Sequence, residues 1–503
     1  MPESVIESHR RRVLAPSFAL LGVCLAATAF GSPTPAHRTP QPLDIGLEPL
    51  VGSANTITRT TDGMVWIGTN QGLIRHDGRQ AVRFDRRSYP TLASDVITHL
   101  AAGPGGSLWV GTDGGGLARF DGIGFRAVSQ PTSVGGTWTV TALLTSSDGP
   151  LFIGTPDALL SLAWGANSSS HGLPGVRVTA LEEDDSGQIW AAAGSSLFRR
   201  AQSVFQPIPL PLGFPSAPIA DVEVIGSDQV WVAREDGLVR LEGDFRGLGL
   251  PRSAEHVSGF DAPVCCLTAD RDDTLWAASG SSLYRLDASG DRTVFDVEAP
   301  ITRLFLDRSD DLWITTDGAG IVLLAGSTTT TEAPTCTLLG LRVDGRPWSL
   351  LSPRTFDPVE VIEIDVAAPT FRDPESIRVA WRLGDQPWTA VDGPIVLRDL
   401  PAGRHLVEVV AHRGSTAGTT LEIDLEIRPR LFETLPFWVA GGTLVLALLG
   451  TWTWLNRRRR RLDAWMAEQE AAERADLEIL DDSAVTLGPR RVEARPPSDG
   501  DGS

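Results

Sequence analysis

Three kinds of side chain in this 503-residue chain could do chemistry: tyrosines beside acids, an adjacent cysteine pair, and aspartates that recur in turns. A sialidase-type hydrolase needs a tyrosine nucleophile with an acidic partner, and arginines for the substrate carboxylate. The chain holds only Tyr89 and Tyr284, and Tyr284 lies in an apolar strand pattern where packing accounts for it. The recurring aspartates, which we expect to close β-turns, are Asp62, Asp148, Asp185 and Asp273. These residues give little support to a hydrolase of this type.

The adjacent pair Cys265 and Cys266 lies in the apolar run PVCCLTAD, which favours a buried strand whose neighbouring side chains point to opposite faces. Adjacent cysteines occur in some quinone-dependent dehydrogenases, but those enzymes also need a calcium site of acidic and amide side chains. Two small buried residues are the first interpretation, and a vicinal disulfide in an oxidising compartment is the alternative. The eight histidines and four cysteines form no His-x-x-x-His or Cys-x-x-Cys arrangement. We therefore expect neither a metal nor a cofactor.

Binding is the remaining role for the chemically distinctive residues. Three loop segments combine planar and hydrogen-bonding groups, namely RRSYPTLASD (86–95), SVGGTWT (133–139) and RSAEHVSGFD (252–261). The candidate ligand-binding residues in them are Arg86, Arg87, Tyr89, Trp138 and His256. Such a mixture suits a saccharide or a peptide, provided that the surrounding elements bring the three loops to one mouth of the fold.

The elements around these loops come from a repeat. The pattern of the segment DGMVWIGTNQGLIRHDG (62–78) occurs in seven units, this one included, and each unit consists of an apolar strand, a Gly/Asp turn, a strand with a large aromatic residue, a second turn and further short strands. The aligned aromatics are Trp66, Trp109, Phe152, Trp190, Trp231, Trp276 and Trp313. A unit of four strands cannot bury both of its faces, so the pattern predicts a seven-bladed β-propeller over residues 43–325 with these aromatics packed between blades. The apolar residues 43–50 would supply the missing outer strand of the last blade.

The chain after the repeats predicts three further segments. A Thr-rich linker (326–335) leads into residues 336–430, whose alternating apolar and polar positions predict an Ig-like β-sandwich of about seven strands. Residues 435–455 contain no charge and are long enough to form a transmembrane helix. Arg457 to Arg461 follow directly, which places residues 456–503 in the cytoplasm as a tail, helical over 461–482 and then disordered.

The N-terminus predicts export. Three arginines (10–12) precede an apolar run that ends at residue 30, so we expect a signal peptide over 1–30, with a signal anchor as the alternative, and a Pro-rich linker over 31–42. Together with the second apolar segment, this predicts a single-pass protein of the inner (cytoplasmic) membrane with residues from about 40 to 434 outside the cytoplasm. The net charge of −19 argues against a nucleic-acid partner, because a phosphate-binding surface needs an excess of cations.

Two sets of phrases resemble one known family. VWIGTNQGLIRHDG (65–78) and LWVGTDGGGLARFDG (108–122) resemble the two-component regulator propeller repeat of bacterial periplasmic sensors. VAWRLGDQPW (379–388) and LRDLPAGRHLVEVVAHR (397–413) resemble the triple-tyrosine domain that joins such propellers to the membrane. Trp381, Val396 and His405 stand where the name-giving tyrosines are expected, at packing positions.

The resemblance implies an extracytoplasmic ligand-binding sensor rather than an enzyme. Family members usually continue into a kinase, a cyclase or a DNA-binding module, but no histidine follows His412 and no Gly-rich nucleotide loop follows the helix. We therefore expect signalling through a separate cytoplasmic protein, with homodimer formation left open. The second hypothesis is a membrane-tethered protein–protein interaction scaffold, and the third is a propeller enzyme such as a sialidase-like hydrolase.

Overall fold

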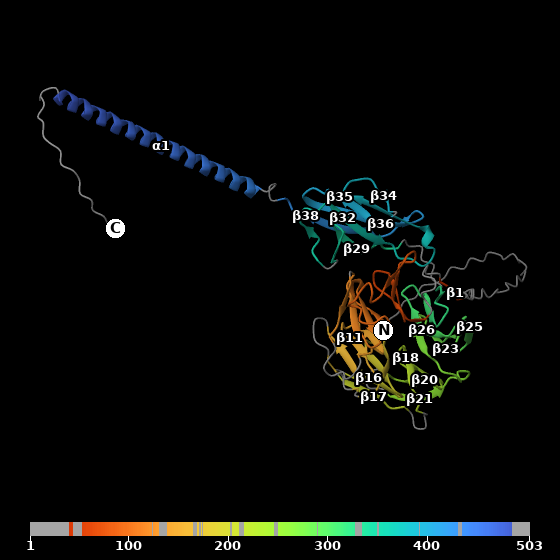
Figure 1. The fold of residues 1–503 in the computed structure, drawn as a ribbon. Helices are drawn as coiled ribbons and strands as arrows, with labels where there is room; N and C mark the ends of the chain where they lie inside the picture. The colour runs from red at the N-terminus through yellow and green to blue at the C-terminus, as the bar shows by residue number, and fades with distance from the viewer. Residues whose placement is uncertain are drawn as a thin grey trace, which may run out of the picture. The chain divides into compact units, whose positions relative to one another are not determined.

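Each of the seven sequence repeats forms one antiparallel sheet, and the sheets are the blades of a propeller. The computed structural model describes residues 40–43, 53–122, 124–129, 138–163, 169–170, 173, 175–201, 204–210, 216–245, 250–288, 290–326, 334–349, 352–391, 393–430 and 435–484. The expected signal peptide and the chain after residue 484 lie outside these described residues. The colour sequence in Figure 1 runs around the ring from orange through yellow to green, so consecutive blades are neighbours.

The strands follow the same order in every blade, from the innermost to the outermost. Blade 1 holds β2 (Ala54–Arg59), β3 (Val65–Thr69), β4 (Gly72–His76) and β5 (Ala81–Phe84); blade 2 holds β6 (Ile97–Ala102), β7 (Leu108–Thr112), β8 (Gly116–Phe120) and β9 (Phe125–Ala127), with a short 3-10 turn, η1 (Pro104–Gly106), between β6 and β7. Blade 3 holds β10 (Ala142–Thr145), β11 (Leu151–Gly154), β12 (Leu159–Leu162) and β13 (Ser169–Ser170); blade 4 holds β14 (Val178–Glu183), β15 (Ile189–Ala193), β16 (Ser196–Ala201) and β17 (Val204–Ile208). Blade 5 holds β18 (Ile219–Ile225), β19 (Gln229–Arg234), β20 (Gly237–Gly243) and β21 (Pro251–His256); blade 6 holds β22 (Cys266–Ala269), β23 (Leu275–Ser279), β24 (Ser282–Leu286) and β25 (Arg292–Asp296).

Blade 7 is completed from the other end of the repeat region. Its own strands are β26 (Ile301–Leu306), β27 (Leu312–Thr316) and β28 (Ile321–Leu324), and the outermost strand is β1 (Gln41–Pro42). Gln41 pairs with Leu323, and the Leu43 amide donates to Ile321 O at 2.9 Å. The closing strand thus begins two residues before the expected segment 43–50, inside the stretch expected to be a linker. Residues 44–52 lie outside the described part of the chain.

The seven repeated aromatics all lie on the second strand of their blades and are buried, with exposed fractions between 0% and 7%. Several contact an aromatic residue of the next blade, as Trp66 does with Phe120 at 5.0 Å between ring centroids. In five blades the residue paired with the tryptophan on the third strand is an arginine whose guanidinium lies 5.3–6.0 Å from the indole centre; these are Arg75, Arg119, Arg199, Arg240 and Arg285. The tryptophan is therefore packed between sheets and also covered by a cation, which adds an electrostatic attraction to its burial.

A ring of side-chain hydrogen bonds joins the inner strands. In five blades the inner strand has a register shift at its second residue. In six blades the side chain at this position donates to a backbone carbonyl at the start of the next inner strand or just before it. We call these six the junction hydrogen bonds: Asn55 to Ile97, Thr98 to Val140, Thr141 to Val178, Thr179 to Ile219, Cys265 to Ile301, and Thr302 to Ala54. The last one closes the ring from blade 7 to blade 1. Blade 5 has Ala220 at this position, and its side chain has no donor.

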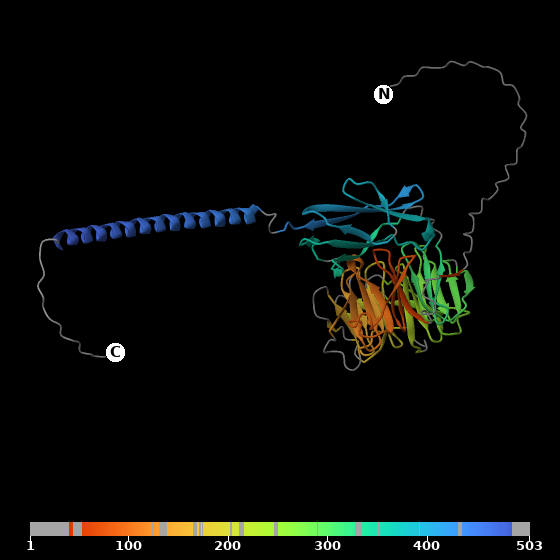
Figure 2. The same cartoon turned by 45° about the horizontal axis from the view of Figure 1, so that its top comes forward.

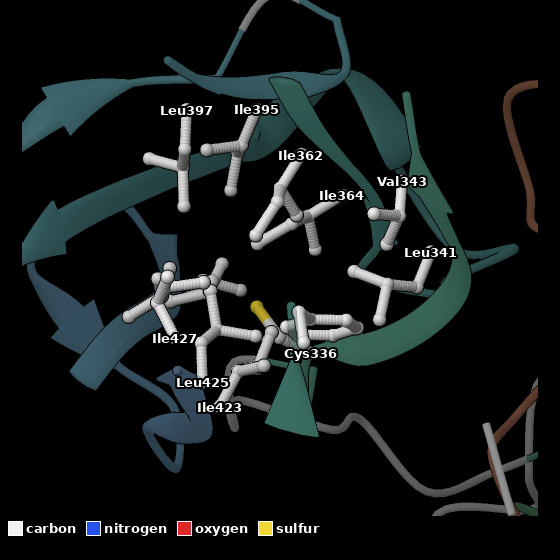
Figure 3. Packing of buried hydrophobic residues seen from close by; sticks show 14 of the residues in the cluster. Cys336, Leu341, Val343, Ile362, Ile364, Ile395, Leu397, Ile423, Leu425 and Ile427 are labelled. Carbon is white, nitrogen blue, oxygen red and sulfur yellow. The ribbon is translucent and has the colours of Figure 1, made fainter. Parts of the chain in front are cut away.

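The sandwich is built from two sheets. One contains β30 (Arg346–Trp348), β29 (Thr337–Val343), β32 (Val361–Ala367) and β35 (Ile395–Arg398); the other contains β31 (Thr355–Phe356), β38 (Leu421–Ile427), β36 (Gly403–Arg413), β33 (Ile377–Leu383) and β34 (Thr389–Ala390), with β37 (Thr416–Ala417) paired to β36. This arrangement matches the A-B-E and C-F-G sheets of an immunoglobulin-like sandwich. Apolar side chains from the two sheets face one another, such as Ile362 and Leu397 opposite Leu425 and Ile427 (Figure 3).

Of the three positions where the family's tyrosines were expected, only one is a clear packing position. Trp381 packs against the sandwich core. Val396 is 41% exposed because its neighbours Ile395 and Leu397 take the inward-facing positions of β35. The partly buried His405 ring lies 2.7 Å from Pro401 O through Nε2. The expectation that all three are packing positions is wrong for Val396.

A single helix, α1 (Leu435–Ala484), follows the sandwich. It is long and apolar enough to span a membrane within Pro436–Arg474, where a window of 18 residues has a mean hydropathy of 1.4. The expected tail helix over 461–482 is continuous with the apolar segment rather than separate from it. A 50-residue helix is about 75 Å long, more than twice the hydrocarbon thickness of a bilayer of about 30 Å.

Contacts divide the chain into two units. One short segment belongs to the propeller unit although the residues before and after it belong to the sandwich unit. The first unit comprises Met1–Glu332 together with Pro369–Pro374, and the second comprises Ala333–Ala368 with Glu375–Ser503. Figure 2 shows the strands of both units from a second direction. The segment Pro369–Pro374 lies between β32 and η2 (Pro374–Ser376), so a piece of chain from within the sandwich sequence forms part of the propeller unit.

We call Pro369–Pro374 the docked segment, because its side chains pack among residues of blades 1 and 7. The Phe371 ring lies edge-on to Trp313 with 4.9 Å between centroids. Arg372 Nε donates to both carboxylate oxygens of Asp311 at 3.0 Å. A side chain on Gly78 would lie 1.6 Å from Thr370 O, so this approach of the backbones requires glycine.

Candidate functional site

Ionisable side chains gather on the inner strands of the propeller, which line its axis. His99 lies on β6, Glu182 on β14, Asp221 and Glu223 on β18, and Arg303 on β26. These five side chains comprise three carboxyls, one guanidinium and one imidazole. We call these five residues the channel cluster.

Two of the carboxylates hold the exposed edge of blade 6. Asp221 Oδ2 accepts from Leu267 N at 3.0 Å, and Glu223 Oε1 accepts from Ala269 N at 3.1 Å. Asp221 also lies 4.0 Å from the guanidinium of Arg303. An innermost strand has no further strand beyond it to accept its amide protons, so these carboxylates complete the hydrogen bonding of β22.

Burial controls the protonation of the cluster. Removal from water raises the pKa of Glu182, Asp221 and Glu223, and neighbouring carboxylates add to the effect at Glu182 and Glu223. The pKa of Glu223 is raised to about 8, and the charge of Arg303 opposes the shift at all three. Glu223 is therefore largely protonated at neutral pH, which reduces repulsion within the cluster.

His99 responds to burial in the opposite sense. Desolvation, followed by the positive charge of Arg303, lowers the pKa of His99 to about 3. The imidazole is thus neutral across the physiological range, so Arg303 is the one permanent cation in the cluster.

A cavity of 330 Å³ opens where the inner strands of blades 5, 6 and 7 end in turns. Glu223 belongs both to this cavity and to the channel cluster. Six carboxyl groups and two guanidinium groups line it, namely Asp185, Glu223, Asp270, Asp273, Asp307 and Asp310 with Arg271 and Arg308. This volume suits a small ligand, and the excess of carboxylates favours one that carries positive charge.

Some of the lining aspartates have structural tasks. Asp307 accepts from Ser309 N at 2.7 Å and from the Trp313 indole at 3.1 Å, and Asp184 holds Trp190 in the same way at 2.9 Å. Asp307 and Asp184 are the first aspartates of their turns, and each closes its turn. In blade 4 the closing residue is therefore Asp184 rather than the expected Asp185.

The other aspartates singled out from the sequence also lie in turns. Asp270 accepts from Asp272 N and Thr274 N, so it rather than Asp273 closes the blade 6 turn. Asp273 has the left-handed φ of 60° that such turns require. Asp62 Oδ1 accepts from the Thr60 hydroxyl at 2.5 Å.

The residues predicted from the first loop divide into packing and surface. Tyr89 packs on Phe84 at 5.1 Å and on Phe125 at 5.6 Å, and is partly buried. Arg86 and Arg87 are exposed beside it. The Tyr89 ring thus fills the space between the outer strands of blades 1 and 2.

Trp138 and His256 do not share this loop. Trp138 is only 6% exposed and packs with Trp109 and Val140. His256 is the last residue of β21, the outermost strand of blade 5, where a loop was expected. The structure therefore places Trp138 in the core and His256 on the outermost strand of blade 5, and the exposed members of the five predicted residues are Arg86, Arg87 and His256.

Sequence reasoning missed the channel cluster because its members occupy apolar strand patterns such as IADVEVI and ITRLFL. A signal was nevertheless present, since aligned inner strands carry Ala142 and Ala180 where Asp221 and Arg303 stand. A charge at one repeat position that is small or apolar in other blades indicates a specialised site. Within the described residues, no group of three His, Cys, Asp or Glu side chains is arranged to hold a metal ion.

Comparison with known proteins gave structural neighbours alone, since no family model and no curated protein matches the sequence. The extracellular domains of the hybrid two component systems BT3049 and BT4673 from B. thetaiotaomicron are similar at 14% and 15% identity, with TM-scores of 0.46 and 0.47. Both alignments cover 75% of this chain, which spans 55% and 57% of the two domains.

A third neighbour is an enzyme. Virginiamycin B lyase from Staphylococcus aureus is similar at 14% identity with a TM-score of 0.48, and the alignment covers 57% of this chain and 99% of the lyase. At such identities the likeness concerns the fold alone.

Proposed function

We propose that this protein is an extracytoplasmic sensor of the two-component type, held in the inner membrane by α1, whose propeller binds a small ligand. The observation that carries the proposal is the 330 Å³ cavity at the turns of blades 5, 6 and 7, whose lining includes Glu223 of the channel cluster. The apolar part of α1 and the five arginines after it support the membrane orientation.

The ligand of this site is a small molecule with an amine or guanidinium group. The cavity wall carries more carboxylates than cations, and a cationic group would also oppose the burial and the repulsion from Asp221 that raise the pKa of Glu223. Binding of such a ligand should therefore release a proton from Glu223, because the ligand favours the ionised carboxylate.

The turn of blade 7 offers a route from the cavity to the docked segment. Arg308 and Asp310 line the cavity, while Ser309 O accepts from Arg372 Nη2 at 3.2 Å and the Asp311 carboxylate binds Arg372. A ligand that moves this turn changes the hold on the docked segment, whose ends continue into β32 and β33. The signal would be a population shift between two arrangements of the docked segment, passed along the chain to α1 and then to a separate cytoplasmic protein.

Calorimetric titration of the full chain in detergent with amines, guanidines and neutral sugars tests the ligand class. We expect binding of a cationic compound that is weakened at least tenfold by Glu223→Gln with Asp310→Asn, and unaffected by the exposed Glu422→Gln. If the chain instead binds neutral sugars, and if this binding depends on Arg86 and Arg87, then the binding site lies in the loops predicted from the sequence and not in the cavity.

Removal of the tail after residue 456 tests the signalling part. A sensor loses its cytoplasmic output and keeps its ligand, whereas the scaffold hypothesis predicts that partner capture outside the cytoplasm persists with no output to lose. The proposal includes no catalysis, and turnover of a hydrolase substrate by purified residues 40–430 would replace it with the enzyme hypothesis.

A further inference from the structure

The inner strand of blade 6 donates two hydrogen bonds to the carboxyl groups of Asp221 and Glu223, but blade 6 takes part in only one junction hydrogen bond. On one side, Ala220 provides no junction hydrogen bond to Val264. On the other, the donor is the Cys265 thiol, 3.4 Å from Ile301 O, and a thiol is a weaker donor than the hydroxyls and the amide that serve elsewhere in the ring. Any change to the Cys265 sulfur therefore acts on the sole junction hydrogen bond of this blade.

The two adjacent sulfurs lie together rather than on opposite faces. Cys265 Sγ and Cys266 Sγ are 2.7 Å apart. Cys266 pairs with Ala278, and the Cys265 amide donates to the same Ala278 O at 3.0 Å, so two residues oppose one as in a β-bulge. The bulge turns the Cys265 side chain to the face that Cys266 already occupies, which corrects the alternation expected from the sequence.

We propose that Cys265 and Cys266 form a reversible oxidation site, which closes to a vicinal disulfide and in doing so removes the junction hydrogen bond between blades 6 and 7. Cys265 is the partly exposed member of the pair, so it meets the oxidant, while Cys266 is fully buried. The proposal does not depend on the ligand of the cavity.

The oxidant is a disulfide-bonded thiol compound of the extracytoplasmic space. The Cys265 thiolate attacks one sulfur of that disulfide, which breaks the oxidant's bond and releases one thiolate. The Cys266 thiolate then attacks Cys265 Sγ of the mixed disulfide and releases the second. The two cysteine protons pass to the two released thiolates, so one external disulfide is reduced to two thiols while one protein disulfide forms.

Adjacent residues make a bond of this kind easy to reverse. Their Cα atoms are about 3.8 Å apart, whereas disulfides usually join Cα atoms about 4.4–6.8 Å apart. Strained disulfides are the more readily reduced ones, and labile disulfides are typically regulatory. The disulfide would thus form and break with the redox state of the compartment rather than stabilise the fold permanently.

The consequence for the protein follows from the position of β22. This strand begins at Cys266 and ends at Ala269, which starts the part of the cavity wall formed by blade 6. Leu267 N and Ala269 N on the same strand are the donors to Asp221 and Glu223. Oxidation therefore alters one end of a strand whose other end carries the cavity and two contacts of the channel cluster.

Mass spectrometry of the full chain in membrane vesicles tests the site. Vesicles are equilibrated with reduced and oxidised glutathione at several ratios, alkylated, denatured, alkylated again and digested. We expect the peptide with both cysteines to lose two hydrogens and escape alkylation as the oxidised fraction rises, and to recover after reduction. Cys336, buried in the sandwich core, should be alkylated after denaturation throughout. Alkylation of Cys265 and Cys266 at every ratio overturns the proposal.

Two variants connect the bond to the junction. Cys265→Thr introduces at this position the threonine hydroxyl that makes the junction hydrogen bond in four other blades. The Tm of this variant should not change with the glutathione ratio. The Tm of the unaltered chain should fall by several degrees on oxidation. Cys266→Ala keeps the Cys265 donor and should likewise be insensitive. A redox-dependent Tm that persists in both variants would place the effect elsewhere and refute the proposed role.

Discussion

Arg59 of blade 1 and Asp307 of blade 7 form an ion pair, with 2.7 Å between Nη1 and Oδ2, although 248 residues separate them in the sequence. The Asp307 side chain is fully buried and also holds the Trp313 indole and two amides of its own turn. One carboxylate thus links the turn, the aromatic wedge and the neighbouring blade at the place where the ring closes.

Replacement of Asp307 by alanine should lower the free energy of unfolding by about 3–5 kcal/mol, because Arg59 and the turn amides lose their shared acceptor. Asp270→Ala is the matched control, since its carboxylate accepts from two turn amides. We expect that loss to be about 1–3 kcal/mol. Denaturant unfolding of residues 40–430 gives both values, and equal losses would contradict the closing role of Asp307.

Deletion of residues 40–50 should lower the Tm of the whole propeller, because blade 7 loses its outermost strand β1 and its edge is opened to solvent. A deletion of similar length after residue 485 serves as control and should leave the Tm unchanged. If the two deletions change the Tm equally, β1 does not close the ring.

Stability should depend on pH through Glu223. Its pKa is about 8 in the folded chain against 4.5 for the free group, so the folded state binds more protons between these values. The stabilisation from the protonated form is present near pH 5 and is lost as the pH rises towards 8. Glu223→Gln should therefore become more stable relative to the unaltered chain by up to a few kcal/mol over this range.

Thermal unfolding at pH 5, 6.5 and 8 measures this difference. Glu422→Gln, an exposed change on β38, controls for the loss of one negative charge. A constant difference between Glu223→Gln and the unaltered chain at all three pH values would refute the assignment of the high pKa to Glu223.

Arg372→Ala should release the docked segment, because its guanidinium binds Asp311 through both carboxylate oxygens and also reaches Ser309 O. Hydrogen exchange of the amides from residue 370 to 373 should accelerate at least tenfold, while the interior strands of the blades stay protected. Arg378→Ala, an exposed arginine nearby in the sequence, is the control. Unchanged exchange in Arg372→Ala would show that Phe371 alone holds the segment.

Much of the fold could be predicted because the sequence signals for each blade lie within a single repeat. Trp66 or its equivalent, the Gly/Asp turn before it and the strands on either side occur within about forty residues, so the blade, its strand order and its buried wedge follow from local pattern. The alternation of the sandwich strands and the uncharged stretch of α1 are signals of the same local kind. The candidate binding site could not be predicted in the same way. The loops chosen for their mixed polar groups contain Trp138 and Tyr89, whose side chains pack against neighbouring blades.

By itself, the sequence determined the number of blades, the sandwich after them and the apolar helix, because all three rest on short-range periodicity. Only the tertiary structure decided which residues meet. It placed Asp221 beside Arg303, joined β1 to β28, docked Phe371 on Trp313, and brought Cys265 and Cys266 to one face. The first three join residues far apart in the chain, and the last depends on a bulge that strand alternation does not reveal. Closing the ring and burying charges on its axis creates these contacts, so no local pattern could show them.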